Sequence, residues 1–68
     1  NFPFDIVKKY IFFDSKRWDL ETLDGIIVKL PNKNYNESLK NFLKIKNKNS
    51  FKKYLVFDYR IPDQLILK

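Results

Sequence analysis

The sequence predicts a small α+β domain, with one helix packed on a face of a mixed or antiparallel sheet of about five strands. Short apolar runs rich in aromatic and β-branched residues are separated by turn residues, which is typical of strands. One segment in the middle of the chain instead has apolar residues at helical spacing. The chain has 68 residues, 44% hydrophobic and 18% aromatic, so we expect one domain with a compact core.

The first predicted strand covers residues 10–13, after a lead-in of residues 1–9 in which Pro3 disfavours a helix interior. Its run of aromatic and β-branched residues fits a strand that is buried on both faces or packed beside one. Asp14 and Ser15 then end the strand, because both residue types favour turns.

Residues 16–30 show the clearest pattern, two alternating segments joined near Gly25, which is the single glycine of the chain. A two-residue loop would pair Leu20 with Lys29 and mix the two faces. A three-residue loop pairs Leu20 with Val28, so that the apolar side chains of the alternating set share one face. We therefore predict a three-residue hairpin loop with Gly25 in the left-handed conformation and a G1-type bulge. The shared face comprises Trp18, Leu20, Thr22, Ile26, Val28 and Leu30.

The predicted helix covers residues 35–45. Pro31 ends the preceding strand, Asn34 is a good N-cap, and Glu37 follows it at the spacing of a capping box. Apolar side chains then recur at helical spacing, which predicts a stripe that packs on the hairpin. That stripe comprises Tyr35, Leu39, Phe42 and Leu43, and Lys40 and Lys44 lie on the opposite side.

Two further strands are predicted near the end of the chain. Residues 54–59 are predicted to form a strand with Leu55, Val56 and Phe57 at its centre. Residues 60–63 contain Pro62 and are typical of a turn, and residues 65–67 begin a last strand. The resulting order of elements is strand, hairpin, helix, strand, strand.

The residue types that most enzymes and metal sites need are missing. The sequence has no Cys and no His, so no disulfide, thiolate nucleophile or imidazole base is available. Its serines have no plausible base nearby, and one glycine cannot form a phosphate-binding loop. Asp14 and Asp19 could act as paired carboxylates, but we expect both at strand ends and exposed to solvent. We therefore predict that the chain is not an enzyme and has neither a cofactor nor a metal site.

The net charge of +6 has two interpretations. It could mark a surface for nucleic acid. Alternatively, it follows from A/T-rich codons, because Lys, Asn, Ile, Phe and Tyr are abundant while Gly is rare, and we favour this interpretation. The nucleic-acid interpretation also lacks a signature such as an RRM aromatic motif or a KH GxxG loop. A basic nucleic-acid-binding module is the alternative function, and a subdomain of an enzyme whose site lies elsewhere is another.

Neither a membrane span nor a signal peptide is predicted within the chain. No run of about 18 apolar residues is present, and residues 2–13 are interrupted by charges and Pro3. The chain begins with Asn1 rather than Met, so we expect further residues upstream, which could still include such a segment.

Residues 16–31, KRWDLETLDGIIVKLP, resemble the β-domain of the FtsQ/DivIB family of bacterial cell-division proteins. That family has a basic residue before a Trp, an alternating strand, a Gly turn and an apolar strand that ends in Leu-Pro. A short amphipathic helix follows, as predicted here, and then a strand ending in Asp-x-Arg, matched by Asp58, Tyr59 and Arg60. A Pro-Asp turn and one more short strand complete the resemblance, which covers about residues 10–68.

The resemblance implies a function and a location. FtsQ/DivIB proteins are non-catalytic, single-pass proteins of the bacterial inner membrane, with a POTRA domain between the membrane helix and the β-domain. They bind the FtsB–FtsL pair and help recruit the septal wall-synthesis machinery to the division site. We therefore expect residues 1–68 to be a β-domain fragment that faces the periplasm, without the membrane helix and the POTRA domain.

The resemblance also implies a partner-binding surface with two parts. Arg17 and Arg60 match basic residues that meet acidic residues of FtsB, although Arg17 could be merely solvated and Arg60 could pair with Asp58 or Asp63. The last strand matches a sheet edge onto which FtsB adds a strand, although it could simply close the sheet. Trp18 could also anchor a partner, but a Trp on the apolar face of a hairpin is more often core, and we assign it there. The expected partner-binding residues are Arg17, Tyr59, Arg60, Gln64, Leu65, Ile66 and Leu67.

Overall fold

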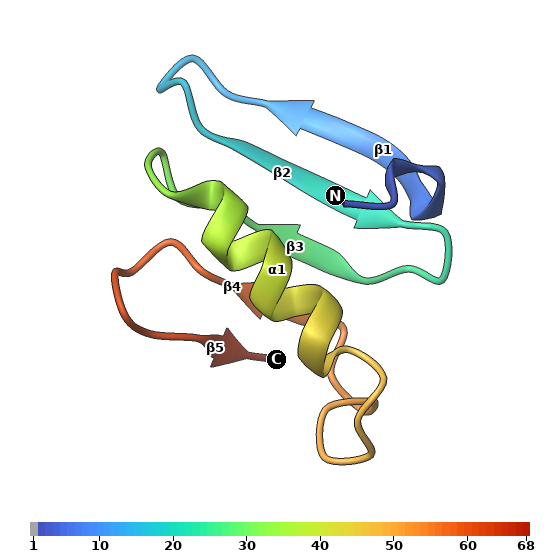
Figure 1. The fold of residues 1–68 in the computed structure, drawn as a ribbon. Coiled ribbons are helices and arrows are strands. Elements are labelled where there is room, and N and C mark those ends of the chain that lie inside the picture. Colours follow the sequence, from blue (N-terminus) through green and yellow to red (C-terminus); the bar gives the residue numbers. More distant parts are fainter. Residues whose placement is uncertain (1) are drawn as a thin grey trace.

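The computed structural model describes residues 2–68, which form one five-stranded sheet and one α-helix (Figure 1). The elements are η1 (Phe4–Ile6, a 3₁₀ turn), β1 (Val7–Phe12), β2 (Trp18–Thr22), β3 (Ile27–Lys29), α1 (Tyr35–Ile45), β4 (Val56–Asp58) and β5 (Ile66–Leu67). The strands are adjacent in chain order, from β1 at one edge of the sheet to β5 at the other.

The sheet is mixed because α1 connects two strands that run in the same direction. β3 and β4 are parallel, since the chain crosses back through the helix between them, whereas the other neighbouring strands are antiparallel. Figure 1 shows α1 lying on one face of the sheet, across β3. The predicted fold class, order of elements and helix position are therefore confirmed.

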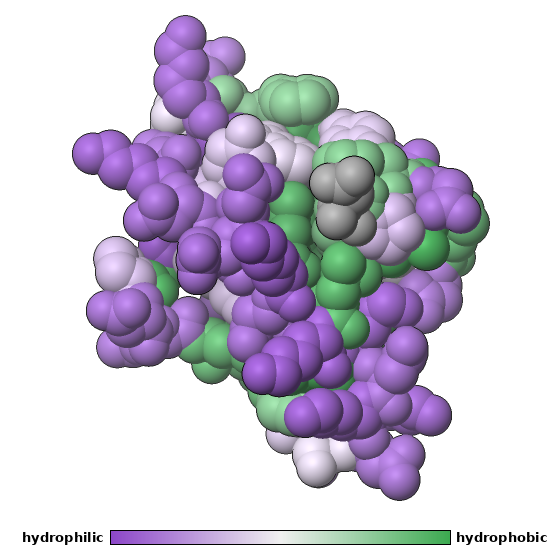
Figure 2. Space-filling model, viewed as in Figure 1, coloured by the Kyte–Doolittle hydropathy of each residue, from purple (hydrophilic) through white to green (hydrophobic). Residues whose placement is uncertain are grey.

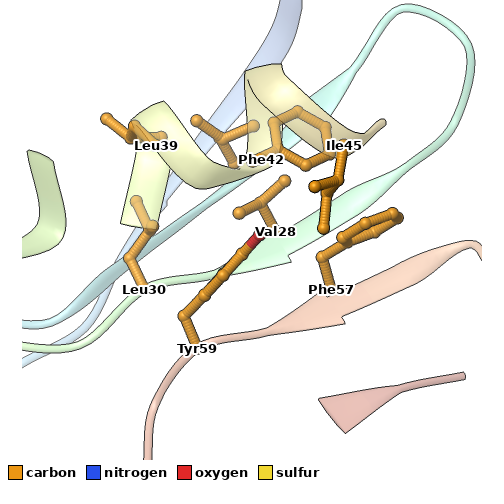
Figure 3. Close-up of a cluster of buried hydrophobic side chains, with 8 residues drawn as sticks. Val28, Leu30, Leu39, Phe42, Ile45, Phe57 and Tyr59 are labelled. Carbon is orange, nitrogen blue, oxygen red and sulfur yellow. The ribbon is translucent and has the colours of Figure 1, made fainter. Parts of the chain in front are cut away.

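The core lies between α1 and the sheet (Figure 3). Leu39, Phe42 and Ile45 point from the helix toward the strands, where the Phe42 and Phe57 rings meet edge to face with centroids 5.1 Å apart. The buried apolar side chains are Leu20, Val28, Leu30, Leu39, Phe42, Ile45, Phe57 and Tyr59. Trp18 is half-buried and packs against this cluster, so its assignment to the core holds in part.

The β2–β3 hairpin has the predicted register. Leu20 lies opposite Val28, and both side chains are fully buried. The N–H of Thr22 donates to the carbonyl of Ile26 at 2.8 Å, which leaves three residues in the loop. Gly25 has φ of +88°, and its N–H donates to the Thr22 carbonyl at 3.0 Å. The alternation of side chains along the strands therefore predicted both the loop length and the conformation of its glycine.

β1 begins earlier than predicted and lies at an edge. Residues 7–9, expected in a lead-in, extend the strand, which contains an irregularity between Val7 and Lys9. The sequence left two environments open for this strand, burial on both faces or a place beside a buried strand. β1 pairs with β2 alone, so the structure shows the second. Tyr10 and Phe12 are 41% and 75% exposed, and their rings lie 5.9 and 6.1 Å from that of Trp18.

α1 has the predicted bounds but a different N-terminus. Asn34 has φ of +60°, in the left-handed region, and its side chain makes no capping hydrogen bond. The N–H of Glu37 instead donates to the backbone carbonyl of Asn34 at 3.1 Å. The predicted capping box was wrong because side-chain capping needs an extended backbone at the N-cap. The apolar stripe is also shifted, since Ile45 is buried and Leu43 is half-buried.

β4 and β5 are shorter than the segments predicted for them. The residues before β4 lie outside the sheet, and Leu55 is 59% exposed. Figure 2 shows hydrophilic residues over the outer side of α1, opposite the core. Within residues 2–68, none of the helices has the length and apolar character needed to cross a membrane.

Candidate functional site

A groove of about 980 Å³ opens at the end of the sheet where β2 begins and where β3 and β4 end. The β3–α1 connection, the first turns of α1 and the β4–β5 connection form its walls. Most of the predicted partner-binding residues line it together, namely Arg17, Tyr59, Arg60, Gln64 and Leu65. The other two, Ile66 and Leu67, form β5, which continues directly from the groove wall. The fold therefore brings Arg17 and Arg60 to one surface although they are far apart in sequence.

Charged side chains cross the sheet in a row on the face that α1 leaves uncovered. Asp19 lies opposite Lys29, and Lys29 lies opposite Asp58, so these three side chains share one face. Their neighbours along each strand belong to the core under α1, which places the charges on the other face. With the two arginines at its ends, the row alternates in sign: Arg17, Asp19, Lys29, Asp58 and Arg60.

The Arg60 end of the row is held by a forked ion pair. Nε of Arg60 donates to Oδ1 of Asp58 at 2.9 Å, and Nη2 donates to Oδ2 at 2.7 Å. The backbone N–H of Arg60 also donates to Oδ1, at 3.0 Å. The hydrogen bond from the Arg60 side chain lowers the pKa of Asp58, a residue that is only 4% exposed. Of the two acidic partners considered for Arg60, the structure therefore selects Asp58.

Arg60 nevertheless keeps donors for another molecule. Its side chain is 44% exposed, and the forked pair with Asp58 uses only part of the guanidinium. The bound carboxylate fixes the plane of the guanidinium, so the remaining N–H groups are held in one orientation at the groove. Pairing with Asp58 is therefore compatible with a partner contact, because the ion pair orients the arginine without covering it.

Arg17 is held in a similar way at the other end of the row. Its Nη1 donates to Oδ1 of Asp19, and its guanidinium carbon lies 4.3 Å from the centre of the Phe13 ring. Asp19 also accepts a hydrogen bond from the N–H of Leu30 at 3.3 Å. The prediction that Asp19 is exposed was wrong, since it is 4% exposed. The neighbouring strands and the Arg17 side chain enclose this carboxylate. Its role in the fold is to accept hydrogen bonds from the Arg17 side chain and the Leu30 N–H.

Tyr59 lines the groove but is largely buried. Its side chain is 8% exposed, and its hydroxyl donates to Oδ1 of Asn41 on α1 at 2.7 Å. Burial raises the pKa of Tyr59. Its N–H donates to the Lys29 carbonyl at 2.9 Å, which extends the contact between the ends of β3 and β4. Tyr59 therefore fixes the backbone from which Arg60 projects.

β5 forms an open edge of the sheet. Lys68 exchanges two backbone hydrogen bonds with Val56, at 3.0 and 3.1 Å. Because the direction of these groups alternates along an antiparallel strand, the N–H and C=O of Leu67 point away from β4. The sheet order of the described residues places no strand beyond β5. Leu65, Ile66 and Leu67 are half-buried, and Gln64 is exposed.

Sequence reasoning missed Asp19 as the acidic partner of Arg17, whereas it considered Asp58 as one of two partners for Arg60. Arg17 and Asp19, like Asp58 and Arg60, are two residues apart, a spacing that puts both side chains of a strand on one face. Opposite charges at that spacing were therefore a signal for both ion pairs. The contribution of the β3–α1 connection to the groove carries no comparable signal, because it depends on how α1 packs.

An open sheet edge beside oriented arginines is typical of a domain that binds an extended protein segment. The family model described as cell division protein FtsQ/DivIB, C-terminal, matches residues 5–60 of the chain. The chain therefore belongs to the FtsQ/DivIB family and has a role in cell division; members of this family are membrane-anchored, non-enzymatic scaffolds. The match includes Arg17, Tyr59 and Arg60 and ends before β5. No curated protein and no solved structure matches the chain.

Proposed function

We propose that this chain is a scaffold module of the division machinery that binds an FtsB–FtsL-like pair by strand addition at β5. The observation that carries the proposal is the position of the open β5 edge beside the groove that contains Arg17 and Arg60. A partner segment that leaves the edge can thus enter a groove with basic side chains. Membership of the FtsQ/DivIB family supports division proteins as the partners.

The backbone of β5 would supply the first part of the interface. A partner strand beside β5 would pair with the outward N–H and C=O of Leu67, which lie at the edge of the sheet. It would also cover more of Leu65 and Ile66, which are half-buried in the free chain. These backbone bonds stabilise the complex with little demand on the partner's side chains, so selectivity has to come from elsewhere.

The arginines would supply that selectivity. Acidic side chains that flank the added strand would meet the remaining donors of Arg60 and of Arg17. Both guanidiniums are already oriented by Asp58 and Asp19, so less side-chain freedom is lost when a partner binds. Charges at the rim of an interface also select the register in which a strand pairs.

The wider setting of this module is part of the same proposal. The chain would be the part of a single-pass inner-membrane protein that faces the periplasm, following a POTRA domain and a membrane helix. Through the FtsB–FtsL-like pair it would recruit the septal wall-synthesis proteins indirectly. No step of this role requires catalysis by residues 1–68.

Calorimetric titration with a synthetic extracytoplasmic segment of the cognate FtsB-like protein tests the mechanism. Arg60→Glu should weaken binding by about tenfold or more, because a like charge then faces the partner's carboxylate. Leu67→Pro should have a similar effect, because proline removes the outward N–H while it remains compatible with an edge strand. Neither variant changes the N–H groups that join β5 to β4.

Lys40→Glu is the matched control, since Lys40 is an exposed residue of α1 that does not line the groove. It changes the net charge as much as Arg60→Glu does and should alter the affinity by no more than about twofold. Equal affinities for all three variants would contradict strand addition at β5. Failure of the unaltered chain to bind the segment would contradict the choice of partner.

A further inference from the structure

One segment carries the entire net charge of the chain. Six lysines and no acidic residue lie between Glu37 and Asp58, while the rest of the chain has eight basic and eight acidic residues. We refer to residues 38–57 as the basic segment. A/T-rich codons would raise the number of lysines throughout the chain without removing acidic residues from one stretch. The lysines of the basic segment are Lys40, Lys44, Lys46, Lys48, Lys52 and Lys53.

These lysines are available for an external partner. All except Lys46 are exposed, and Lys46 is half-buried. The ion pairs found among residues 2–68 are Arg17–Asp19 and Arg60–Asp58, and neither includes a lysine of the basic segment. The negative end of the α1 dipole accounts for basic residues close to Ile45 but not for those farther along the loop.

The fold gathers several of these side chains. Lys40 and Lys44 are one turn apart on the outer side of α1, which Figure 2 shows as hydrophilic. The loop after α1 keeps turning, since the N–H of Lys52 donates to the carbonyl of Lys48 at 3.1 Å. Figure 1 shows this loop projecting from the C-terminal end of α1, away from the β3–α1 and β4–β5 connections that form the groove.

Apolar side chains accompany the lysines at this end of the molecule. Leu55 is 59% exposed, and Phe51 and Tyr54 are half-buried beside the loop. Nζ of Lys53 lies 5.3 Å from the centre of the Tyr54 ring. Lysines mixed with an exposed leucine and a tyrosine are the composition of surfaces that rest at the boundary between lipid headgroups and acyl chains.

We propose that the basic segment docks on an anionic phospholipid surface. Clusters of about 4–8 lysines near a bilayer bind anionic headgroups by charge alone and need no shaped pocket. The family is membrane-anchored, so a bilayer lies within reach of the protein. With the basic segment on lipid, the groove lies toward the other end of α1 and stays open to a protein partner, and β5 runs from the groove to the end of the molecule where Lys68 pairs with Val56.

The surface suits lipid better than nucleic acid. Single-stranded nucleic acid is bound by exposed rings on which bases stack, yet in the basic segment Phe42 and Phe57 are fully buried and Phe51 and Tyr54 are half-buried. The exposed aromatic residues of the chain lie elsewhere, chiefly Phe4, Tyr10 and Phe12 around β1. The basic segment also contains no arginine, the residue best suited to bidentate contacts with phosphates and bases.

Vesicle sedimentation tests the proposal with the 68-residue chain. Vesicles of phosphatidylcholine containing about 30% phosphatidylglycerol should bind the chain, whereas phosphatidylcholine alone should not. A triple variant in which glutamine replaces Lys48, Lys52 and Lys53 should partition onto the anionic vesicles roughly 100-fold less. Each lysine removed should lower the partition coefficient roughly fivefold. Added salt should weaken the binding of the unaltered chain, because it screens charges outside the protein.

A second triple variant separates position from net charge. Lys8, Lys9 and Lys16 are also exposed, lie outside the basic segment, and give the same charge change when replaced by glutamine. This variant should lose less than about threefold in partitioning. Equal losses in the two triple variants would overturn the proposal, as would failure to bind the anionic vesicles. Tighter binding to a single-stranded or duplex oligonucleotide than to those vesicles would overturn it in favour of nucleic acid.

Discussion

Leu20→Ala is the sharpest test of how the hairpin builds the domain. Leu20 is fully buried, with Val28 opposite it on one neighbouring strand and Tyr10 on the other. The substitution removes three carbon atoms, which corresponds to about 2.4 kcal/mol of transfer free energy at about 0.8 kcal/mol for each. A cavity between two paired strands and α1 collapses poorly, so the measured loss should lie in the upper part of the range of about 2–5 kcal/mol.

Urea denaturation followed by tryptophan fluorescence measures the change, since Trp18 packs against the same cluster. A domain of this length has a free energy of unfolding of about 3–10 kcal/mol, so the variant loses a large share of it. Leu23→Ala is the matched control, because the same atoms are removed from a loop residue that is 68% exposed. We expect the control to cost less than about 0.5 kcal/mol.

Similar losses for Leu20→Ala and Leu23→Ala would refute the assignment of the buried face. If Leu20→Ala fails to fold at all, Val28→Ala gives a milder change at the residue opposite, and it should still cost more than the Leu23 control. A Val28 variant as stable as the unaltered chain would also contradict the argument.

Two further predictions follow from local geometry. Gly25→Val should lower the free energy of unfolding, measured by urea denaturation, by about 1–3 kcal/mol. The cost comes from the backbone, since φ is +88° and no atom lies within 4 Å of an added Cβ. Gly25→Asn should cost less, since Asn tolerates left-handed backbone. The hydrogen bond from the Arg60 side chain lowers the pKa of Asp58 in the folded state. The ionised Asp58 therefore stabilises the fold at any pH above its ordinary pKa of 3.8, and this contribution is lost as the pH falls through the lower pKa of the folded state. Asp58→Asn should therefore lower stability at neutral pH and flatten its acid dependence below pH 3.8, and an unchanged acid dependence would contradict the ion pair.

Features that depend on local backbone chemistry were predictable from the sequence. The period-2 alternation around Gly25 determined which residues pair across the hairpin, because a one-residue slip would expose Leu20 and Val28. The bounds of α1 followed from Pro31 and the helical spacing of its apolar residues. The capping box failed because a sequence pattern does not report the backbone angle of Asn34, which is set by the path of the chain leaving β3.

Features that depend on distant packing were less accessible. The aromatic run of residues 10–13 suggested burial, yet β1 lies at an edge because α1 packs on the centre of the sheet. The burial of Asp19 follows from strands on both sides and from the Arg17 side chain, and neither is visible in a charge pattern taken alone. The resemblance to a family predicted that Arg17 and Arg60 contact the same partner. The groove that both residues line could not be predicted, because it depends on how α1 and the loops pack.

The two edges of the sheet differ in a way that bears on the proposed binding mode. β1 carries Lys8 and Lys9 and an irregularity in its pairing, features that discourage another strand from adding to an edge. β5 has two apolar residues and no charge within it, but it is short, so an added strand gains few backbone hydrogen bonds. A partner that pairs with β5 alone would therefore bind weakly and with little selectivity. In the proposed interface, contacts to the arginines of the neighbouring groove would add both affinity and selectivity, so that interface needs the edge and the groove together.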